Sequence, residues 1–264
     1  WKGIFRYTKM FTKKKIIFTS LLGKVDITLP KPSKKIMPEW FKKMPNFCEK
    51  GDYISGTVKK CMPFLDALSM GYIISSTWEM GWKRVIPVDQ DGKKLKPGFE
   101  ITYPDPVRDI LQHHALGIEK HSPYQISEDA YNEDEVKMTI KILSPWLIKT
   151  PPGYSCLFVP PLNHVNLPFR PLSGVVDTDT YSKMPVNFPS MPKKFPEKQQ
   201  TKIIPVGTPI VMVIPFKRES WKMEVQSGKS ILDDAVGLRD QRLGFFKKIV
   251  DNYKNMAWNK KEFD

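Results

Sequence analysis

The sequence is poor in the residues that build metal sites and disulfides. It contains only three cysteines and four histidines. Cys48, Cys61 and Cys156 form no CxxC pair and no cluster with histidine. Because a structural zinc site needs four such ligands at characteristic spacings, we expect no metal and no cofactor. Three widely spaced cysteines are typical of free thiols in a reducing compartment.

Long apolar runs are also missing. No stretch approaches the roughly 20 consecutive apolar residues of a membrane-spanning helix. Near the N-terminus, residues 13–15 (KKK) interrupt the apolar residues, whereas a signal peptide needs an unbroken apolar block. We therefore expect a protein that is neither secreted nor embedded in a membrane.

Positive charge is abundant but unevenly distributed. The net charge is +14, and residues 1–60 carry 15 Lys and Arg against 4 Asp and Glu. The pattern indicates either a solvated lysine-rich arm or a contact with a polyanion, such as nucleic acid or an acidic partner surface. Lysine rather than arginine predominates, which favours diffuse attraction over base-specific recognition. The candidate binding residues are Lys13, Lys14, Lys15, Lys34, Lys35, Lys42 and Lys43.

Proline is plentiful and spread along the chain, with 24 residues, about twice the ordinary share of roughly 5%. This favours many short strands and turns over long helices. We expect a mainly β (α+β) protein, either a β-sandwich or a β-clip-like barrel. We divide it into a basic N-terminal arm and connector (1–56), a β-rich core (57–220) and a C-terminal helical extension (221–264).

Local signals refine this division. A single helical turn is expected at 38–45, with Pro38 at its first position. Residues 57–68 are expected to form a short segment followed by a helix that starts at Pro63 and ends at Gly71. A hairpin is expected at 78–103 around an Asp-Gly turn. A second helix is expected at 105–117, and an amphipathic helix at 238–258. Residues 136–216 are expected to be β throughout, with units that read strand–turn–strand at 146–159 and 203–216. Residues 190–200, rich in proline and lysine, are expected to form a mobile loop.

Four pieces of the β core carry a family resemblance. They are TPPGYS at 150–155, GVVDTDTY at 174–181, PVNF at 185–188 and IPVGTPIVMVI at 204–214. In this order they resemble the strand-and-turn skeleton of the β-clip class, to which dUTPases and dCTP deaminases belong. The resemblance implies that Asp177 occupies the position of a water-activating aspartate. It also implies that Tyr181 lies near the tyrosine that stacks on the sugar.

Other features depart from that family. Residues 161–166 (PLNHVN) stand where the phosphate-binding turn would be, Tyr181 is displaced by one residue, and the glycine-rich C-terminal lid is missing. His164 together with Asp177 would make an acid–base couple if the fold brought them together. Cys156 and His164 have the residue types of a nucleophile and its base, but an alternating strand pattern favours Cys156 as a core residue.

A wider resemblance covers most of the chain. Its carriers are MPEWFKKM at 37–44, TVKKCMPFLDALSMGYII at 57–74, WLIKTPPGYS at 146–155 and NYKNMAWNKK at 252–261. The sequence is similar to a functionally unassigned family encoded by large tailed phages, with relatives in bacteria. The resemblance implies a phage origin and a place in the virion, or otherwise in the host cytoplasm, and it implies no reaction.

Three functions follow as hypotheses. The first is a non-enzymatic structural component of a phage virion, which contacts other copies of itself or other virion proteins through its terminal extensions. The second is a β-clip nucleotide-binding protein or hydrolase with Asp177, Tyr181 and His164 at its site. The third is a nucleic-acid-binding protein that uses the basic arm. Trp40 in this arm either stacks on bases or fastens the arm to the core or to a neighbouring subunit.

Overall fold

The computed structural model describes most of the chain. The described residues are 14–22, 27–50, 53–86, 88–94, 98–103, 116–122, 125–194, 201–225, 254 and 258–264. They form a mainly β protein in which all the strand pairs are antiparallel. Two expected helices, 105–117 and 238–258, lie almost entirely outside the described residues. Gly117, the expected end of the first, begins a strand.

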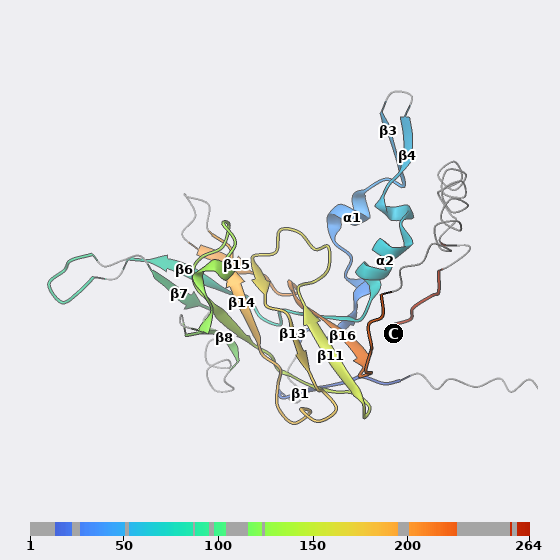
Figure 1. The fold of residues 1–264 in the computed structure, drawn as a ribbon. Helices are drawn as coiled ribbons and strands as arrows, with labels where there is room; N and C mark the ends of the chain where they lie inside the picture. Colours follow the sequence, from blue (N-terminus) through green and yellow to red (C-terminus); the bar gives the residue numbers. More distant parts are fainter. Residues whose placement is uncertain are drawn as a thin grey trace, which may run out of the picture.

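The largest sheet has five strands in the order β13-β11-β16-β5-β2 (Figure 1). Their bounds are β2 Lys31–Pro32, β5 Tyr72–Ser75, β11 Tyr154–Val159, β13 Gly174–Val176 and β16 Pro209–Lys217. β16 is the longest strand, and four consecutive residues at 210–213 are buried. A strand buried on both faces needs such a continuous apolar run rather than an alternating one. β16 therefore forms the centre of the fold.

A four-stranded sheet, β12-β14-β9-β8, shares the hydrophobic core with the first sheet. Its strands are β8 Gly117–Lys120, β9 Ile140–Leu143, β12 Phe169–Pro171 and β14 Phe188–Pro192. Phe158 of β11 and Phe188 of β14 meet across the two sheets, with ring centroids 5.8 Å apart. This aromatic contact fixes the two sheets against one another.

Three smaller sheets complete the described part of the chain, and two of them join the same core. The first consists of β15 (Thr201–Ile204), β6 (Met80–Val85) and β7 (Gly98–Thr102). The second pairs β1 (Ile17–Ser20) with β10 (Trp146–Lys149), and the third pairs β3 (Phe47–Lys50) with β4 (Tyr53–Gly56). The β6–β7 and β3–β4 hairpins project from opposite ends of the body (Figure 1).

The described strands close no barrel, so the expected β-clip-like barrel is not what they form. The reason lies in two turns. The sequence predicts strand–turn–strand units around 151–153 and 205–208, but the strands that these turns join do not pair with each other. At the first turn, β10 pairs with β1, whereas β11 pairs with β13 and β16. At the second turn, β15 pairs with β6, whereas β16 pairs with β11 and β5. Each turn carries the chain from one sheet to another.

The expected loop at 190–200 is wrong for its first residues. Ser190 and Met191 are fully buried, and they lie in β14, between β12 and β9. Pro189 and Pro192 still contribute carbonyl groups, which accept hydrogen bonds from Leu172 and Val136. Proline lacks only the N–H donor, so its presence does not exclude a strand. Residues 195–200 lie outside the described part.

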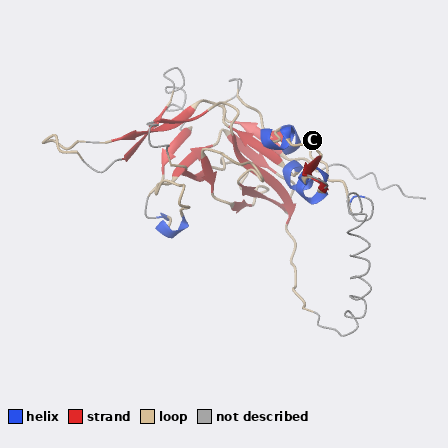
Figure 2. Cartoon of the chain, turned by 90° about the horizontal axis from the view of Figure 1, so that it is seen from above, coloured by secondary structure: helices blue, strands red, loops and turns tan. Residues whose placement is uncertain are grey.

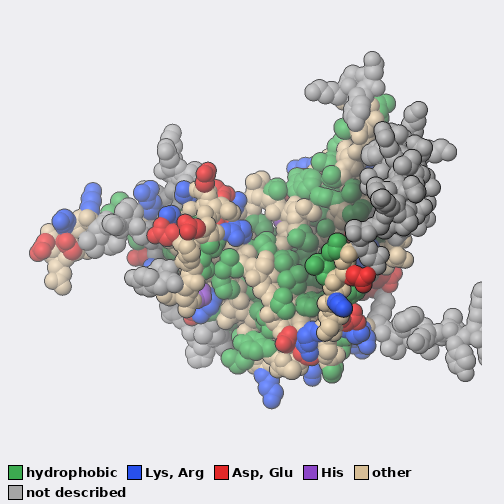
Figure 3. Space-filling view, in the orientation of Figure 1, with side chains coloured by type: hydrophobic (Ala, Val, Ile, Leu, Met, Phe, Trp, Pro, Cys, Tyr) green, Lys and Arg blue, Asp and Glu red, His purple; other side chains and the backbone are tan. Residues whose placement is uncertain are grey.

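The helices pack the N-terminal segment onto the body. α1 (Glu39–Lys43) confirms the expected helical turn, with Pro38 as its N-cap rather than its first residue. α2 (Met62–Ser69) has Pro63 in its first turn, as expected from the sequence. The short 3-10 turns are η1 (Ser33–Lys35), η2 (Val58–Lys60) and η4 (Glu128–Ala130). Hydrophobic side chains gather on the surface beside α1 (Figure 3). No described helix has the length and apolarity that crossing a membrane requires.

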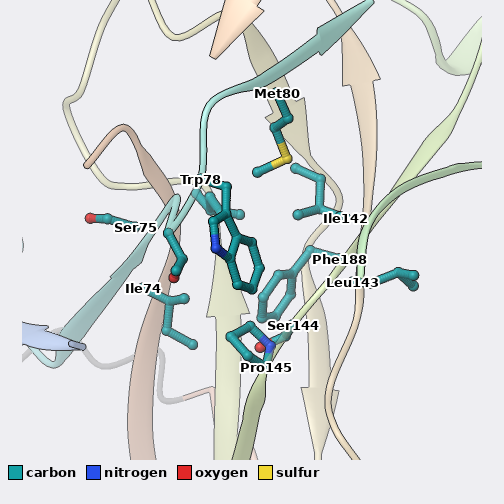
Figure 4. Close-up of a pocket in the computed structure, with 12 residues that line it drawn as sticks. Ile74, Ser75, Trp78, Met80, Ile142, Leu143, Ser144, Pro145 and Phe188 are labelled. Carbon is teal, nitrogen blue, oxygen red and sulfur yellow. The ribbon is translucent and has the colours of Figure 1, made fainter. Parts of the chain in front are cut away.

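The interior between the sheets leaves little space. A cavity of about 10 Å³ lies there, lined by residues of β5, β9, β14 and their neighbours. Figure 4 shows the ring of Trp78 at its centre, with Ile142, Phe188 and Pro145 around it. About one water molecule fills such a volume, so this cavity is too small for a substrate.

Gly71 provides a test of how β5 enters the five-stranded sheet. Its φ is +68°, and an added Cβ would overlap the carbonyl oxygen of Val213 in the neighbouring strand. Gly92, with φ +76°, has no atom within 4 Å of an added Cβ. We expect Gly71→Ala to lower the free energy of unfolding by about 3 kcal/mol or more, against about 1 kcal/mol for the control Gly92→Ala. Urea denaturation measures both, and equal losses would contradict the packing described here.

Candidate functional site

Two of the β-clip-like segments meet at one end of β11. The turn at 151–153 precedes this strand, and the turn at 177–180 follows its neighbour β13. The register pairs Cys156 with Val176, and on the other side Tyr154 with Lys217 of β16. Three chain segments that are distant in the sequence therefore converge where β11 begins.

Arg218, the residue after β16, holds these segments together. Its Nη1 donates to Asp179 Oδ1 at 2.9 Å, and its Nη2 donates to Asp179 Oδ2 at 2.5 Å. The backbone N–H of Gly153 donates to the same Oδ2 at 2.8 Å, and the backbone N–H of Arg218 donates to the carbonyl oxygen of Gly153 at 2.9 Å. A two-pronged guanidinium–carboxylate pair fixes orientation as well as distance.

Asp177 joins the same network at its edge. Its Oδ1 accepts a hydrogen bond from Ser155 Oγ at 2.6 Å and lies 3.3 Å from Arg218 Nη1. Arg218 Nη1 also donates to Ser155 Oγ at 2.9 Å. The Asp177 side chain is 59% exposed and that of Asp179 is 8% exposed. We call Arg218, Asp177, Asp179, Ser155 and Gly153 the Arg218 clamp.

Buried hydroxyl groups lie on the core side of the clamp. The hydroxyls of Thr150 and Thr178 are 2.8 Å apart, and Thr150 Oγ1 donates to the carbonyl oxygen of Tyr154. Thr178 Oγ1 donates to Cys156 Sγ at 3.3 Å. These bonds satisfy polar groups that would otherwise be costly to bury, and they tie the end of β10 to the turn after β13.

The charges of the clamp compensate each other. The hydrogen bonds from Arg218 lower the pKa of Asp179 to about 2, with burial opposing and the Gly153 bond assisting. The pKa of Arg218 is raised in turn, chiefly by its hydrogen bond to Asp179. The guanidinium of Arg218 is thus engaged by two carboxylates of its own chain. This arrangement suits the positioning of chain segments rather than the binding of a substrate phosphate.

The three residues proposed for catalysis are not brought together. Tyr181 donates its backbone N–H to the carbonyl oxygen of Asp177 at 2.8 Å, but its side chain is exposed. His164 lies in the loop that follows Val159, the last residue of β11, whereas Ser155 lies near the strand's beginning. From Ser155, beside Asp177, to Val159 the strand alone spans about 13 Å at roughly 3.3 Å per residue.

His164 belongs to a different contact. Burial lowers its pKa, with the backbone of Ile36 partly opposing. The adjacent Asn163 accepts a hydrogen bond from Trp40 Nε1 at 3.0 Å through its carbonyl oxygen, and Trp40 also contacts Phe64. Of the two interpretations of Trp40, these contacts agree with the one that fastens the N-terminal segment to the body.

The candidate lysines are dispersed among different contacts. Lys34 pairs with Asp264 at 2.7 Å, Lys42 pairs with Glu39 at 2.6 Å, and the ammonium of Lys14 lies over the ring of Tyr154. Lys15, Lys35 and Lys43 are exposed, and Lys13 lies outside the described residues. Polyanion binding by these lysines stays a prediction.

The described part of the chain offers no group of three His, Cys, Asp or Glu side chains placed to hold a metal ion. Comparisons with protein-family models, curated proteins and solved structures found no match to this chain. The phage-family and β-clip resemblances therefore stay predictions, and function has to be argued from the geometry.

Sequence reasoning missed both Arg218 and the segment that follows it. Residues 219–225, here called the exposed segment, lie outside the described strands. Within the segment, Trp221, Met223 and Val225 are 88%, 85% and 81% exposed. Figure 2 shows the chain running away from the sheets beyond the end of β16. The alternation of apolar and polar residues at 221–225 (WKMEV) is a strand pattern, and this was the available signal.

The clamp predicts a specific dependence of stability on pH. Because the folded pKa of Asp179, about 2, lies below its ordinary value of 3.8, the clamp's contribution is fully present above pH 4. It is lost as the pH falls from about 4 to 2. We expect Asp179→Asn to remove part of this acid sensitivity in chemical denaturation, whereas Asp91→Asn in an exposed turn leaves it unchanged. An unaltered pH profile for Asp179→Asn would contradict the clamp.

The cysteines predict a difference in reactivity. All three are free thiols in the structure, with Cys48 and Cys61 exposed and Cys156 buried. Burial raises the pKa of Cys156 to about 11, with the hydrogen bond from Thr178 opposing, and the thiolate is the reactive form. We expect a thiol reagent at pH 8 to modify two cysteines rapidly and the third only on unfolding. Rapid modification of Cys156 in the folded protein would contradict its burial.

Proposed function

We propose that this protein is a structural subunit of a larger assembly, with a β-sandwich-like body and segments that make contacts with neighbouring subunits. The observation that carries the proposal is the exposed segment. Single exposed apolar residues are common on protein surfaces, but Trp221, Met223 and Val225 lie within five residues of one another. Each is more than four-fifths exposed.

The energetics favour a partner for this segment. Burying a large apolar side chain contributes roughly 1.5–3 kcal/mol, and tryptophan is the residue most often found as an interface anchor. The alternation of the segment places its three apolar side chains on one face of an extended chain. Such a face is suited to lie against another protein surface or to extend a sheet.

The Arg218 clamp supports the same function. It fixes the residue from which the exposed segment departs, through the backbone bond to Gly153 and the ion pair with Asp179. A segment that leaves the body in a fixed direction loses less conformational freedom when it binds than one attached by a flexible linker. The projecting β3–β4 hairpin adds further exposed apolar residues, Phe47 and Ile54.

Under the phage resemblance, the assembly is a virion and the protein lies in the particle or in the host cytoplasm before assembly. The nucleotide-hydrolase alternative has weaker support, because Arg218 is engaged by two carboxylates and His164 lies beyond the far end of β11. The nucleic-acid alternative has weaker support as well, because Lys34 and Lys42 are in ion pairs with acidic residues of the same chain.

The exposed segment provides the test of assembly. We expect the purified chain to self-associate with increasing concentration in sedimentation velocity. Replacing Trp221, Met223 and Val225 together with serine should abolish the association, because it removes the apolar face and leaves the fold intact. The matched control replaces Ile86 and Val88, two exposed apolar residues between β6 and β7, and should retain association.

The virion and enzyme hypotheses are separated by two further observations. Mass spectrometry of purified phage particles should find the chain as a component in a fixed ratio to the other structural proteins. The purified chain should leave dUTP and dCTP unchanged. Turnover of either nucleotide that disappears in Asp177→Asn would contradict the structural function.

A further inference from the structure

An open groove lies beside the root of the exposed segment. It has a volume of about 640 Å³ and is formed by the start of β1, the turn between β10 and β11, β16 and the C-terminal residues. The groove falls within the range of roughly 300–1,000 Å³ that is typical of ligand sites. Its apolar residues, here called the apolar floor, include Ile16, Ile17, Tyr72, Tyr154, Pro215 and Phe263.

Charged side chains of both signs also line the groove. Lys14 and Lys15 precede β1, and Glu262 and Asp264 lie in the C-terminal residues. Apolar side chains together with charged ones are the usual composition of a protein–protein contact. The exposed segment likewise combines apolar and charged side chains, because Lys222 lies between Trp221 and Met223. In an extended chain that lysine points away from the face that carries Trp221 and Met223.

We propose that the groove receives the exposed segment of a second copy of this chain, with Trp221 as the anchor in the apolar floor. This proposal deepens the proposed function and rests on it. It names the partner as a second copy and the site as the groove between β1, the 150–154 turn and the C-terminal residues.

The adjacency of segment and groove favours an exchange between two copies. Pro215 lines the groove, and the exposed segment begins only four residues later. When a donor element and its receiving site lie side by side on one surface, two copies can exchange the element about a twofold axis, and the assembly closes. Seven extended residues reach about 23 Å at roughly 3.3 Å per residue, which is enough to cross to a neighbouring body.

Occupation of the groove by the segment of the same chain is disfavoured by the backbone. Arg218 is held to Gly153 and Asp179, so the segment would have to reverse its direction immediately after a fixed residue. Residues 219–225 contain no glycine, proline, asparagine or aspartate, and Ser220 is the one residue among them of a type that favours turns. The observed course instead leads away from the body (Figure 2).

The test compares substitutions in the segment and in the groove by sedimentation velocity of the full chain. Trp221→Ala removes the anchor, and Ile17→Glu places a charge in the apolar floor. Ile203→Glu is the matched control, because Ile17 and Ile203 are both strand isoleucines that are 49% exposed, and only Ile17 lines this groove. We expect Trp221→Ala and Ile17→Glu each to weaken association at least tenfold, and Ile203→Glu to leave it unchanged.

Mixing the two defective chains distinguishes a second copy from other partners of the segment. In a mixture of Trp221→Ala with Ile17→Glu, each heterodimer has one intact segment–groove contact and one that carries both substitutions. Because a contact without its anchor or its apolar floor is already lost, the second substitution costs nothing more. We therefore expect the mixture to associate more strongly than either variant alone. If Ile17→Glu lowers the unfolding midpoint, Phe263→Ala replaces it as the groove variant.

The possible failures are separable. If Trp221→Ala weakens association but the groove variants do not, the groove is not the receiving site, although assembly through the segment stands. If the groove variants weaken association but mixing restores nothing, reciprocal exchange is refuted.

If the chain stays monomeric at every concentration and both substitutions lower its stability, the segment binds its own groove and the proposal is wrong. If Trp221→Ala changes neither association nor stability, the segment is no contact element and the proposed function fails with it.

Discussion

The ion pair between Arg218 and Asp179 determines how the chain leaves its central strand. β16 is the middle strand of the largest sheet, and it ends where the turns at 151–153 and 177–180 meet. The Asp179 side chain is 8% exposed beside Arg218, so removing the arginine takes away both the cation that neutralises this carboxylate and part of what covers it. The same arginine is the last residue fixed to the body before the exposed segment, so one pair of side chains joins core packing to the presentation of Trp221.

This arrangement explains why an enzyme-like pattern accompanies a site that does not suit an enzyme. The segments at 150–155 and 174–181 do lie together in space, as a β-clip-like skeleton would require. The chemistry between them is different, however. Asp177 accepts a hydrogen bond from Ser155 and shares Arg218 with Asp179. The histidine that could complete an acid–base couple lies beyond the far end of β11. A clamp occupies the position where a reaction was hypothesised.

Much of the fold could be predicted from the sequence because it depends on local signals. Pro38 and Pro63 mark the two short helices, the Asp91-Gly92 turn marks the β6–β7 hairpin, and the strands at 136–216 follow their apolar patterns. Strand partners could not be predicted, because pairing depends on residues far apart in the sequence. The turns at 151–153 and 205–208 therefore resembled hairpins although they connect different sheets. Arg218 was missed for the same reason: its role requires the β11–β16 register, which joins residues about sixty positions apart.

Hydrogen exchange of the backbone amides around Arg218, measured by mass spectrometry at low and high protein concentration, tests the central claim most directly. The account predicts that the Arg218 amide, bonded to Gly153, is protected at both concentrations. Amides of residues 219–225 should exchange rapidly in dilute solution and become protected as the chains associate. Rapid exchange of the Arg218 amide in dilute protein, or of residues 219–225 at every concentration, would contradict a clamped segment that binds a neighbouring subunit.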